Sequence, residues 1–294
     1  MTRLMKYIVR LLCTFVVVAS LVSCQIGRHY TRPNLELPAT LADSMSTDSA
    51  SVADYSWEEI YTDTILQGLI WKTLSYNKDM LMAAARVKEL AALKRIDFAN
   101  MFPSVGLRVY AERERDNYGG DHYTKDDEFD LKAIVSWELD LWGKLRWARD
   151  ASMADFLASI ENQRALQMSL IAQVAQAYYE LVALDNELAI VRQTMDARRE
   201  SLHLAQIRYE GGLTSEVAFR QAQVELSRTA TLVPELERQI TAKENELAFL
   251  TGEYPYRIER SQLSQEVNFP LSLPVGLPSS LLERRPDVRE AEQQ

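Results

Sequence analysis

The sequence predicts a mainly α-helical chain that carries one β-hairpin. The 294 residues include only ten Gly and nine Pro, which is typical of a chain dominated by long helices. Apolar residues keep helical spacing over residues 145–209, where neither Gly nor Pro occurs, and the spacing changes to every second residue over residues 104–141. We therefore expect a long antiparallel helical hairpin that contributes to a coiled-coil barrel, together with two transmembrane β-barrel strands.

Residues 1–23 have the organisation of a lipoprotein signal peptide. Three basic residues precede the apolar run 11–22, which is too short to span a bilayer comfortably. The run ends in Leu21-Val22-Ser23-Cys24, which resembles a lipobox, so we predict lipidation of Cys24. The alternative is an ordinary signal peptide with an incidental cysteine. Cys13 would leave with the signal, so a disulfide framework is not expected.

The residue after Cys24 and the net charge restrict the location and the partners. In many Gram-negative sorting systems an Asp after the lipidated cysteine retains the protein in the inner membrane, and here Gln25 follows. We expect an outer-membrane lipoprotein, anchored in outer-membrane lipid and extending into the periplasm. Loss of the three basic signal residues lowers Lys+Arg from 33 to 30 against 42 Asp+Glu, a net charge of −12. Such a charge argues against a nucleic-acid partner.

We find no pattern of residues that indicates an enzyme. The three histidines have no Cys or carboxylate at ligand spacing, and neither a nucleophile elbow nor a phosphate-binding glycine loop occurs. We expect no catalytic residues, no metal and no cofactor. Charged residues of the long helices are interpreted as solvated faces: Arg192, Asp196, Arg198, Arg199 and Glu200.

The region before the strands is divided in two. Residues 24–60 are expected to form an extended, lipid-anchored segment, because residues 25–56 are rich in Pro, Ser, Thr and Asp without periodicity. Residues 61–103 are expected to form equatorial and first periplasmic helices. Their apolar spacing is interrupted near residues 75–77, which predicts a short helix followed by a longer one.

Residues 104–141 predict two strands joined by an external loop. Each alternating run has about ten residues, the length that a tilted strand needs to cross a bilayer. In the two runs, residues 105–111 and 129–141, the odd-numbered positions are apolar and uncharged, and we expect them to meet lipid. Even-numbered positions are expected to face a lumen: Arg108, Glu112, Asp130, Lys132, Ser136, Glu138 and Asp140. The strands alone equally fit a surface hairpin of a soluble α+β domain.

The helical hairpin predicted over residues 142–252 favours the membrane interpretation. About 65 helical residues would make a rod of roughly 100 Å, far longer than ordinary globular helices. The tip is expected near residues 210–215, with Ser215 as a candidate N-cap of the returning helix. Pro234 is expected to interrupt and kink that helix. Trp137, Trp142 and Trp147 are candidates for an interfacial aromatic belt.

Residues 253–294 are interpreted as a linker followed by the start of a second repeat. An offset of 208 aligns Asp287 with Asp79 and Ala291 with Ala83. The signal is weak, because it rests on two identities.

Several motifs resemble the TolC-like outer-membrane efflux family, and its lipoprotein (OprM-like) branch in particular. These are Trp57-Glu58-Glu59-Ile60-Tyr61-Thr62-Asp63, the strand exit Trp137-Glu138-Leu139-Asp140-Leu141-Trp142-Gly143-Lys144-Leu145-Arg146, and the tip Arg208-Tyr209-Glu210-Gly211-Gly212-Leu213-Thr214-Ser215. The match covers essentially the whole chain, as the N-terminal half of such a protein. Ala218 departs from the acid that is common in the family. The resemblance implies a homotrimer with a twelve-stranded barrel and a helical tunnel, which docks to a periplasmic adaptor protein and an inner-membrane pump.

We therefore expect an outer-membrane channel subunit of a tripartite efflux system, a passive export duct for drugs or other small molecules. The tip residues Gly211, Gly212, Leu213, Thr214 and Ser215 are expected to meet the adaptor. Two strands cannot close a barrel, so strands from several chains must combine. The alternatives are a lipid-anchored coiled-coil scaffold and a non-functional truncated duct fragment. A periplasmic adaptor is a third, but it should show a lipoyl-like β domain, which we do not find.

Overall fold

The computed structural model describes residues 27–28, 30–34, 54–117, 123–261 and 282–294. The chain forms two compact units. The strand unit comprises Met1–Leu35, Arg86–Ser159 and Glu292–Gln294, and the helical unit comprises Glu36–Ala85 and Ile160–Ala291. The predicted signal peptide and Cys24 lie outside the described residues.

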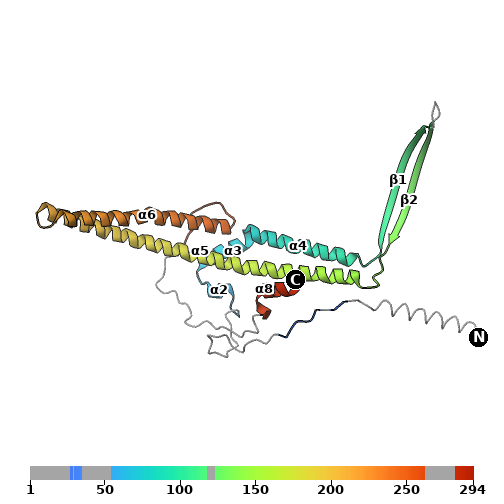
Figure 1. The fold of residues 1–294 in the computed structure, drawn as a ribbon, viewed down its shortest axis with the longest axis horizontal. Coiled ribbons are helices and arrows are strands. Elements are labelled where there is room, and N and C mark those ends of the chain that lie inside the picture. The colour runs from blue at the N-terminus through green and yellow to red at the C-terminus, as the bar shows by residue number, and fades with distance from the viewer. Residues whose placement is uncertain (1–26, 29, 35–53, 118–122, 262–281) are drawn as a thin grey trace, which may run out of the picture. The chain divides into compact units, whose positions relative to one another are not determined.

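The predicted fold class, mainly α with one β-hairpin, is confirmed (Figure 1). The elements are α2 (Trp57–Ile60), α3 (Thr64–Tyr76), α4 (Lys78–Ala99), β1 (Ser104–Asn117), β2 (Tyr123–Ser136), α5 (Lys144–Glu210), α6 (Glu216–Leu250) and α8 (Pro286–Gln293). Helix α5 alone has 67 residues. In the described part of the chain, no helix is both long and apolar enough to cross a membrane.

Short polar residues begin the first three helices. Ser56 and Glu59 form a capping box at α2, a helix of four residues within a segment that the sequence predicted to be extended. The carboxylate of Asp63 accepts the backbone N–H groups of the first turn of α3. Asn77 separates α3 from α4. Its Oδ1 accepts two N–H groups of α4, and its Nδ2 donates to the carbonyl of Leu250 at 3.0 Å.

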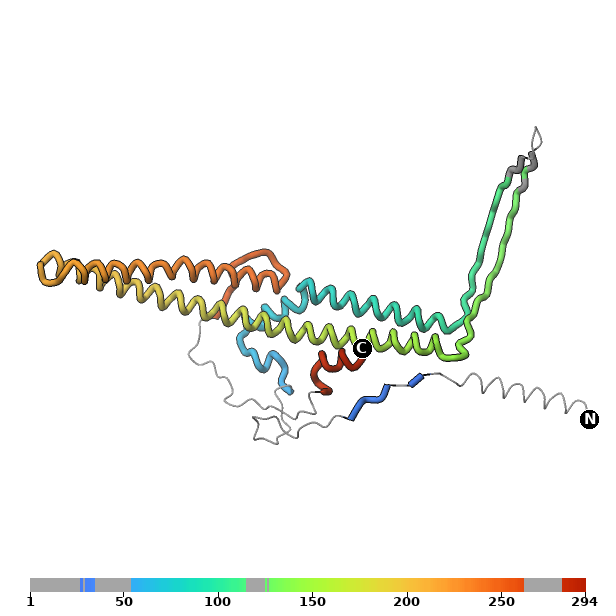
Figure 2. The backbone as a smooth tube through the Cα atoms, viewed as in Figure 1, coloured from blue at the N-terminus to red at the C-terminus, as the bar shows by residue number. Residues whose placement is uncertain are grey.

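Helices α5 and α6 of the helical unit lie antiparallel and side by side (Figure 2). Ion pairs cross between them, such as Arg192 with Glu237 at 2.8 Å and Lys243 with Glu180 at 2.7 Å. Arg192 is exposed, as predicted for a solvated face, and its ion pair reaches the neighbouring helix. The core that these helices share with α3 is apolar and buried: Leu66, Leu69, Ile70, Leu170, Ile171, Val174, Ala175, Ala177, Tyr178, Leu181, Val182, Leu188, Leu236, Ile240, Leu247, Leu250 and Ile258.

Of two predictions about α6, the interruption at Pro234 is wrong, whereas the N-cap position of Ser215 is confirmed. The helix is continuous through Pro234, so this residue does not interrupt it. Ser215 occupies the N-cap position with an extended backbone, but its side chain makes no capping hydrogen bond. The predicted end at Gly252 is correct, because this glycine follows the last helical turn with φ +73°.

The segment 253–261, which we call the strap, ties three helices of the helical unit together. Ile258 is buried in the core. Arg260 forms ion pairs with Asp185 of α5 and Glu244 of α6, the latter at 2.5 Å. The hydroxyl of Ser261 donates to Asp63 at the start of α3. The strap thus reaches α3, α5 and α6 within a few residues.

Candidate functional site

The pairing of β1 with β2 gathers the odd-numbered residues on one face. The two strands are antiparallel and have 14 residues each, longer than the ten predicted. The opposed pairs on this face are Val105 with Val135, Leu107 with Ala133, Val109 with Leu131, and Ala111 with Phe129. The six larger side chains of this set are 69–83% exposed. We call these eight residues the apolar face. It carries no charge, as the alternation in the sequence predicted.

The apolar face ends toward the loop at an ion pair. Arg113 is opposite Asp127, and its Nε lies 2.5 Å from the carboxylate. From residue 105 to residue 111 the strand rises roughly 20 Å. The apolar face is thus an uncharged band that ends at a salt bridge on its loop side.

The opposite face of the strands carries five of the seven predicted lumen-facing residues, namely Arg108, Glu112, Asp130, Lys132 and Ser136, and it places like charges opposite each other. Arg108 is opposite Lys132, and Glu112 is opposite Glu128. Directly opposed like charges destabilise a strand pair. Neighbours along each strand compensate in part, since Lys132 pairs with Asp130 and the hydroxyl of Tyr110 donates to Glu112. Ser136 is the last residue of β2, and its carbonyl accepts the hydroxyl of Ser104.

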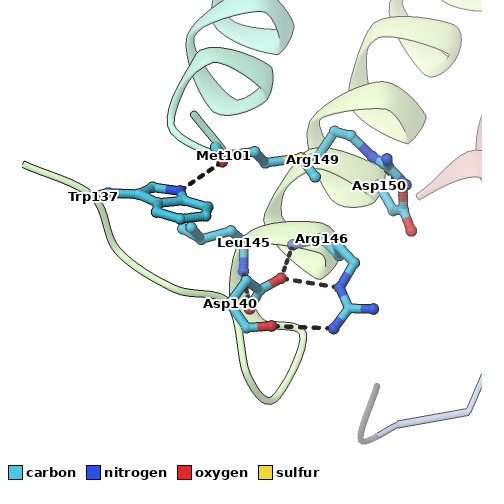
Figure 3. Close-up of polar contacts among 7 residues, drawn as sticks. All are labelled: Met101, Trp137, Asp140, Leu145, Arg146, Arg149 and Asp150. Carbon is cyan, nitrogen blue, oxygen red and sulfur yellow. Dashed lines mark hydrogen bonds and ion pairs between the residues drawn. The ribbon is translucent and has the colours of Figure 1, made fainter. Parts of the chain in front are cut away.

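Glu138 and Asp140 do not lie in a strand, because β2 ends at Ser136. The sequence placed both on the lumen-facing strand, since the apolar alternation continues to Leu141. Asp140 instead accepts the backbone N–H groups of Leu145 and Arg146 at 3.2 and 3.0 Å, and so caps the first turn of α5 (Figure 3). Glu138 forms an ion pair with Lys144 at 3.0 Å.

The junction between β2 and α5 is held by side chains on both sides. The guanidinium of Arg146 donates to the carboxylate and to the carbonyl of Asp140 (Figure 3). Burial alone would raise the pKa of Asp140, but the hydrogen bonds from the backbone of Arg146 and Leu145 and from the Arg146 guanidinium lower it. The indole N–H of Trp137 donates to the carbonyl of Met101 at 3.2 Å. These bonds give Asp140, Arg146 and Trp137 of the strand-exit motif a structural role at the junction.

The predicted tip ends α5 in a Schellman motif. The N–H of Leu213 donates to the carbonyl of Arg208 at 2.8 Å, and the N–H of Gly212 donates to the carbonyl of Tyr209 at 3.0 Å. Gly212 has φ +69°, and a β-carbon built on it would meet nothing within 4 Å. The side chain of Leu213 is 80% exposed, and Val217 is almost as open. The turn is therefore rigid in its backbone and apolar at its surface.

An aromatic pair that the sequence did not indicate joins the helices beside the tip. The rings of Tyr209 and Phe219 stack with centroids 5.7 Å apart and an interplanar angle of 2°. The guanidinium of Arg220 lies 5.6 Å from the Phe219 centroid. Only the positions at the ends of α5 and α6 could have suggested this contact, because the two residues are ten apart across a turn.

The first described residues after Cys24 pack on the start of α5 within the strand unit. A β-carbon built on Gly27, which has φ +145°, would lie 2.5 Å from Cζ2 of Trp147. Arg32 forms a bidentate ion pair with Glu292 at 2.7 and 2.6 Å. Of the three Trp residues predicted to form an interfacial belt, Trp137 and Trp142 are exposed and Trp147 is half-buried.

The part of the chain that the structure describes contains no group of three or more His, Cys, Asp or Glu residues that could hold a metal ion. His29 and His122 lie outside it. His203 is on α5.

The fold places this protein in the class of chains that combine a long helical hairpin with a pair of long antiparallel strands. The solved outer-membrane channel OprN has this fold, with a TM-score of 0.79 and 28% identity over 92% of this chain and 61% of that one. A structure of CusC gives a TM-score of 0.77 at 25% identity, with the same coverage. The family model "Outer membrane efflux protein" matches residues 69–253, and the chain belongs to this family. The TolC-like resemblance is thereby confirmed.

Curated relatives extend the comparison. The cation efflux system protein CusC of Escherichia coli is 26% identical over 284 residues, which are 96% of this chain and 61% of that protein. The toluene efflux pump outer membrane protein TtgF of Pseudomonas putida is 32% identical over 246 residues, 82% of this chain and 50% of that protein. The chain thus spans one half to three fifths of the length of these relatives.

Proposed function

We propose that the chain is an outer-membrane channel subunit of a tripartite efflux system and forms part of a passive export duct. The observation that carries the proposal is the pairing of an exposed, uncharged apolar face with a charged face on the same two strands. Lipid on one side and water on the other account for both faces, whereas a surface hairpin in water accounts only for the charged one. The long helical hairpin supports the same function, because a duct needs rigid walls of this length.

The charged face would line the lumen of a barrel that several chains build together. Two strands leave an unpaired edge on each side, and only a closed barrel satisfies those edges inside a membrane. We expect the homotrimer of the family for this assembly. Arg108, Glu112, Asp130, Lys132 and Ser136 are the proposed lumen residues on the strands. Glu138 and Asp140 would belong to the channel entrance at the junction.

The names of the relatives support export and do not agree on one solute. They describe cation efflux for CusC, toluene efflux for TtgF and antibiotic efflux for ArpC, another relative from Pseudomonas putida. A duct that selects little by itself fits this range, because a partner pump would choose the solute. We infer that drugs or other small molecules pass through, and that no bond is made or broken.

The tip, residues 211–215, is the proposed docking point for a periplasmic adaptor protein, which would link the duct to an inner-membrane pump. Its exposed Leu213 supplies an apolar contact, and its Schellman turn supplies a fixed shape. Lipidation of Cys24 is the proposed anchor in the outer membrane. The contact of Gly27 with Trp147 supports it, because it brings the chain to the strand end of α5 within three residues of that cysteine.

Arginine substitutions on opposite faces of β1 test the membrane assignment. Val109→Arg places a positive charge in the middle of the apolar face. Tyr110→Arg places the same charge at the next residue, on the face that is proposed to line the lumen. We expect Val109→Arg to prevent stable insertion, at a cost of about 2–4 kcal/mol per copy. Tyr110→Arg should insert normally. Heat-modifiable mobility and recovery in the outer-membrane fraction measure both.

Normal insertion of Val109→Arg would contradict the proposal and favour a lipid-anchored scaffold with a small sheet in water. The scaffold also predicts a monomer once the lipid is removed. At the tip, Leu213→Glu should abolish crosslinking to the adaptor and drug resistance without affecting insertion. Intact crosslinking and resistance in this variant and in Gly212→Val would show that the adaptor docks elsewhere.

A further inference from the structure

The proposed duct function assigns no role to a groove between α4 and α5 in the strand unit. It has a volume of about 410 Å³ and is lined by Lys94, Arg95, Phe98, Arg149, Asp150 and Met153. Three of the six residues are cationic and one is acidic. Phe98 and Met153 are about half exposed and form its apolar part.

The charges of the groove are not balanced within the described residues. Arg149 bonds to Asp150, with its Nη2 2.6 Å from the carboxylate (Figure 3). The ammonium of Lys94 lies 4.3 Å from the centroid of the Phe156 ring, a cation–π contact that leaves its charge uncompensated. Among the described residues, no carboxylate forms an ion pair with Lys94 or with Arg95. Two positive charges therefore remain to attract an anion.

The groove lies at the strand end of both helices. Lys94 and Arg95 are within five residues of Ala99, where α4 ends, and Arg149 is five residues after Lys144, where α5 begins. At 1.5 Å per residue these cations lie about 6–8 Å from the helix ends. The headgroup layer on each side of a bilayer is about 5–8 Å thick. If the strands cross the hydrocarbon, the groove is at the level of the headgroups.

Exposed apolar side chains also occur beside the groove, at the same end of α4. Leu93 and Ile96 are exposed on α4, and the exposed Phe102 contacts the groove residue Phe98 edge-on, with ring centroids 5.2 Å apart. Cations mixed with large apolar residues are typical of protein surfaces at a membrane interface, where the apolar groups enter the acyl boundary and the cations meet lipid phosphates. A water-soluble anion would not require this apolar surround.

We propose that this groove binds the headgroup of an anionic phospholipid, with Arg95 and Lys94 on the phosphate and with Phe98 and Met153 against the first part of the acyl chains. Guanidinium and ammonium groups are the usual ligands of phosphate. The proposal rests on the proposed function, since it assumes that the strands lie in the membrane. It adds a lipid-binding site that would fix the height of the helices relative to the bilayer.

Charge reversal at two positions of α4 tests the proposal. Arg95→Glu changes the groove, and Lys88→Glu makes the same charge change two helical turns away, outside the groove and about 10 Å farther from the strands. The full chain in a neutral detergent is titrated with phosphatidylglycerol, phosphatidylcholine or inorganic phosphate, and bound lipid is counted by native mass spectrometry.

We expect phosphatidylglycerol to bind better than phosphatidylcholine, and Arg95→Glu to weaken this binding by at least about fivefold. Lys88→Glu should bind as the unmodified chain does. Phe98→Ser should weaken phosphatidylglycerol binding without changing the weak binding of inorganic phosphate. Circular dichroism of each variant shows whether it is folded before the titration is interpreted.

Equal losses in Arg95→Glu and Lys88→Glu would overturn the proposal, because they would indicate a diffuse attraction to the whole helix. Equal affinity for phosphate and phosphatidylglycerol would do so as well. Covalent dimers of a Met153→Cys variant, formed before lipid is added, would show that a second copy fills the groove. None of these results depends on transport. Failure of the duct itself would appear separately, as normal insertion of Val109→Arg.

Discussion

Both long helices end at a glycine with positive φ, but the two glycines differ in their surroundings. Gly252 follows α6 with φ +73°, and the N–H of Glu253 donates to the carbonyl of Ala248 in the same Schellman motif that Gly212 forms after α5. A β-carbon on Gly252 would lie 2.6 Å from the carbonyl oxygen of Tyr76, whereas one on Gly212 would meet nothing. The end of α6 therefore packs closely on the end of α3.

Alanine at the two glycines should separate backbone strain from overlap. Gly212→Ala is expected to cost about 1–2 kcal/mol, the strain of a left-handed residue. Gly252→Ala should cost about 1–3 kcal/mol more, because a backbone carbonyl has to move. Urea unfolding followed by circular dichroism measures both. Equal costs would show that the contact with Tyr76 relaxes freely.

The hydrogen-bonded pair of the half-buried Asp63 and the buried Tyr178 makes the stability of the fold sensitive to pH in both directions. The hydroxyl of Tyr178 donates to Asp63 at 2.6 Å, and the N–H of Ser261 donates to Tyr178 at 3.2 Å. Burial opposes the charge on Asp63, yet hydrogen bonds from Ser261, Tyr178 and the backbone lower its pKa. Burial and the bond to Asp63 raise the pKa of Tyr178.

The signs of these shifts give opposite pH limits. A lowered pKa means that Asp63 stabilises the fold above its unfolded value of 3.8, and that this contribution is lost as the pH falls through the lower folded pKa. A raised pKa means that Tyr178 stabilises the fold below pH 10, and that this contribution is lost as the pH rises through the folded pKa. We expect the unfolding free energy of Asp63→Asn to fall less steeply at acid pH than that of the unmodified chain. The unfolding free energy of Tyr178→Phe should fall less steeply at alkaline pH. If neither substitution changes the dependence of the unfolding free energy on pH, other groups cause it.

At the scale of elements, the junction before α5 depends on Asp140 more than on its neighbour Glu138. Asp140 caps the helix and holds Arg146, while Glu138 forms an exposed ion pair with Lys144. Asp140→Ala should cost about 1–2 kcal/mol and accelerate amide exchange in the first turn of α5. Glu138→Ala should cost less than about 1 kcal/mol. Hydrogen exchange over residues 144–147 makes the comparison, and equal protection in both variants would contradict the capping role.

Long elements with a regular apolar period were predictable from the sequence, because each further residue in the period supports the same buried or exposed face. The two faces of the strands followed from alternation alone, and the register confirms that odd positions gather on one side. The break between α3 and α4 followed from the interruption near Asn77. These patterns are local, so they can be recognised without knowledge of the tertiary fold.

Elements defined by single contacts were not predictable. Helix α2 has four residues, which is about one turn and too few to show a period. Glu138 and Asp140 were assigned to a strand, because alternation continues past Ser136 although the pairing stops there. The stacking of Tyr209 on Phe219 and the packing of Gly27 on Trp147 depend on where the chain returns, which composition and spacing do not show.

At the scale of the molecule, the strap joins distant parts of the sequence through one guanidinium. Arg260 is 75 residues from Asp185, and its side chain is 12% exposed, whereas the pair of Arg238 with Glu235 lies on the surface with Arg238 67% exposed. Arg260→Ala leaves two carboxylates without their partner and should cost about 2–4 kcal/mol. Arg238→Ala should cost less than about 1 kcal/mol.

Thermal unfolding of the two arginine variants gives the comparison directly. A single cooperative transition at lower temperature in Arg260→Ala would show that the strap stabilises the helical unit as a whole. A cost no larger than that of Arg238→Ala would mean that solvent replaces the ion pairs, and would contradict the role of the strap.

The apolar face also affects the newly made chain before it assembles. Strands of 14 residues with six large exposed apolar side chains and two unpaired edges present a template for pairing with other chains. In water such a surface aggregates, at a rate that rises with concentration. On the proposed function, we therefore expect a newly made chain to have a limited lifetime in water, and its yield to depend on a holdase or on prompt contact with a bilayer.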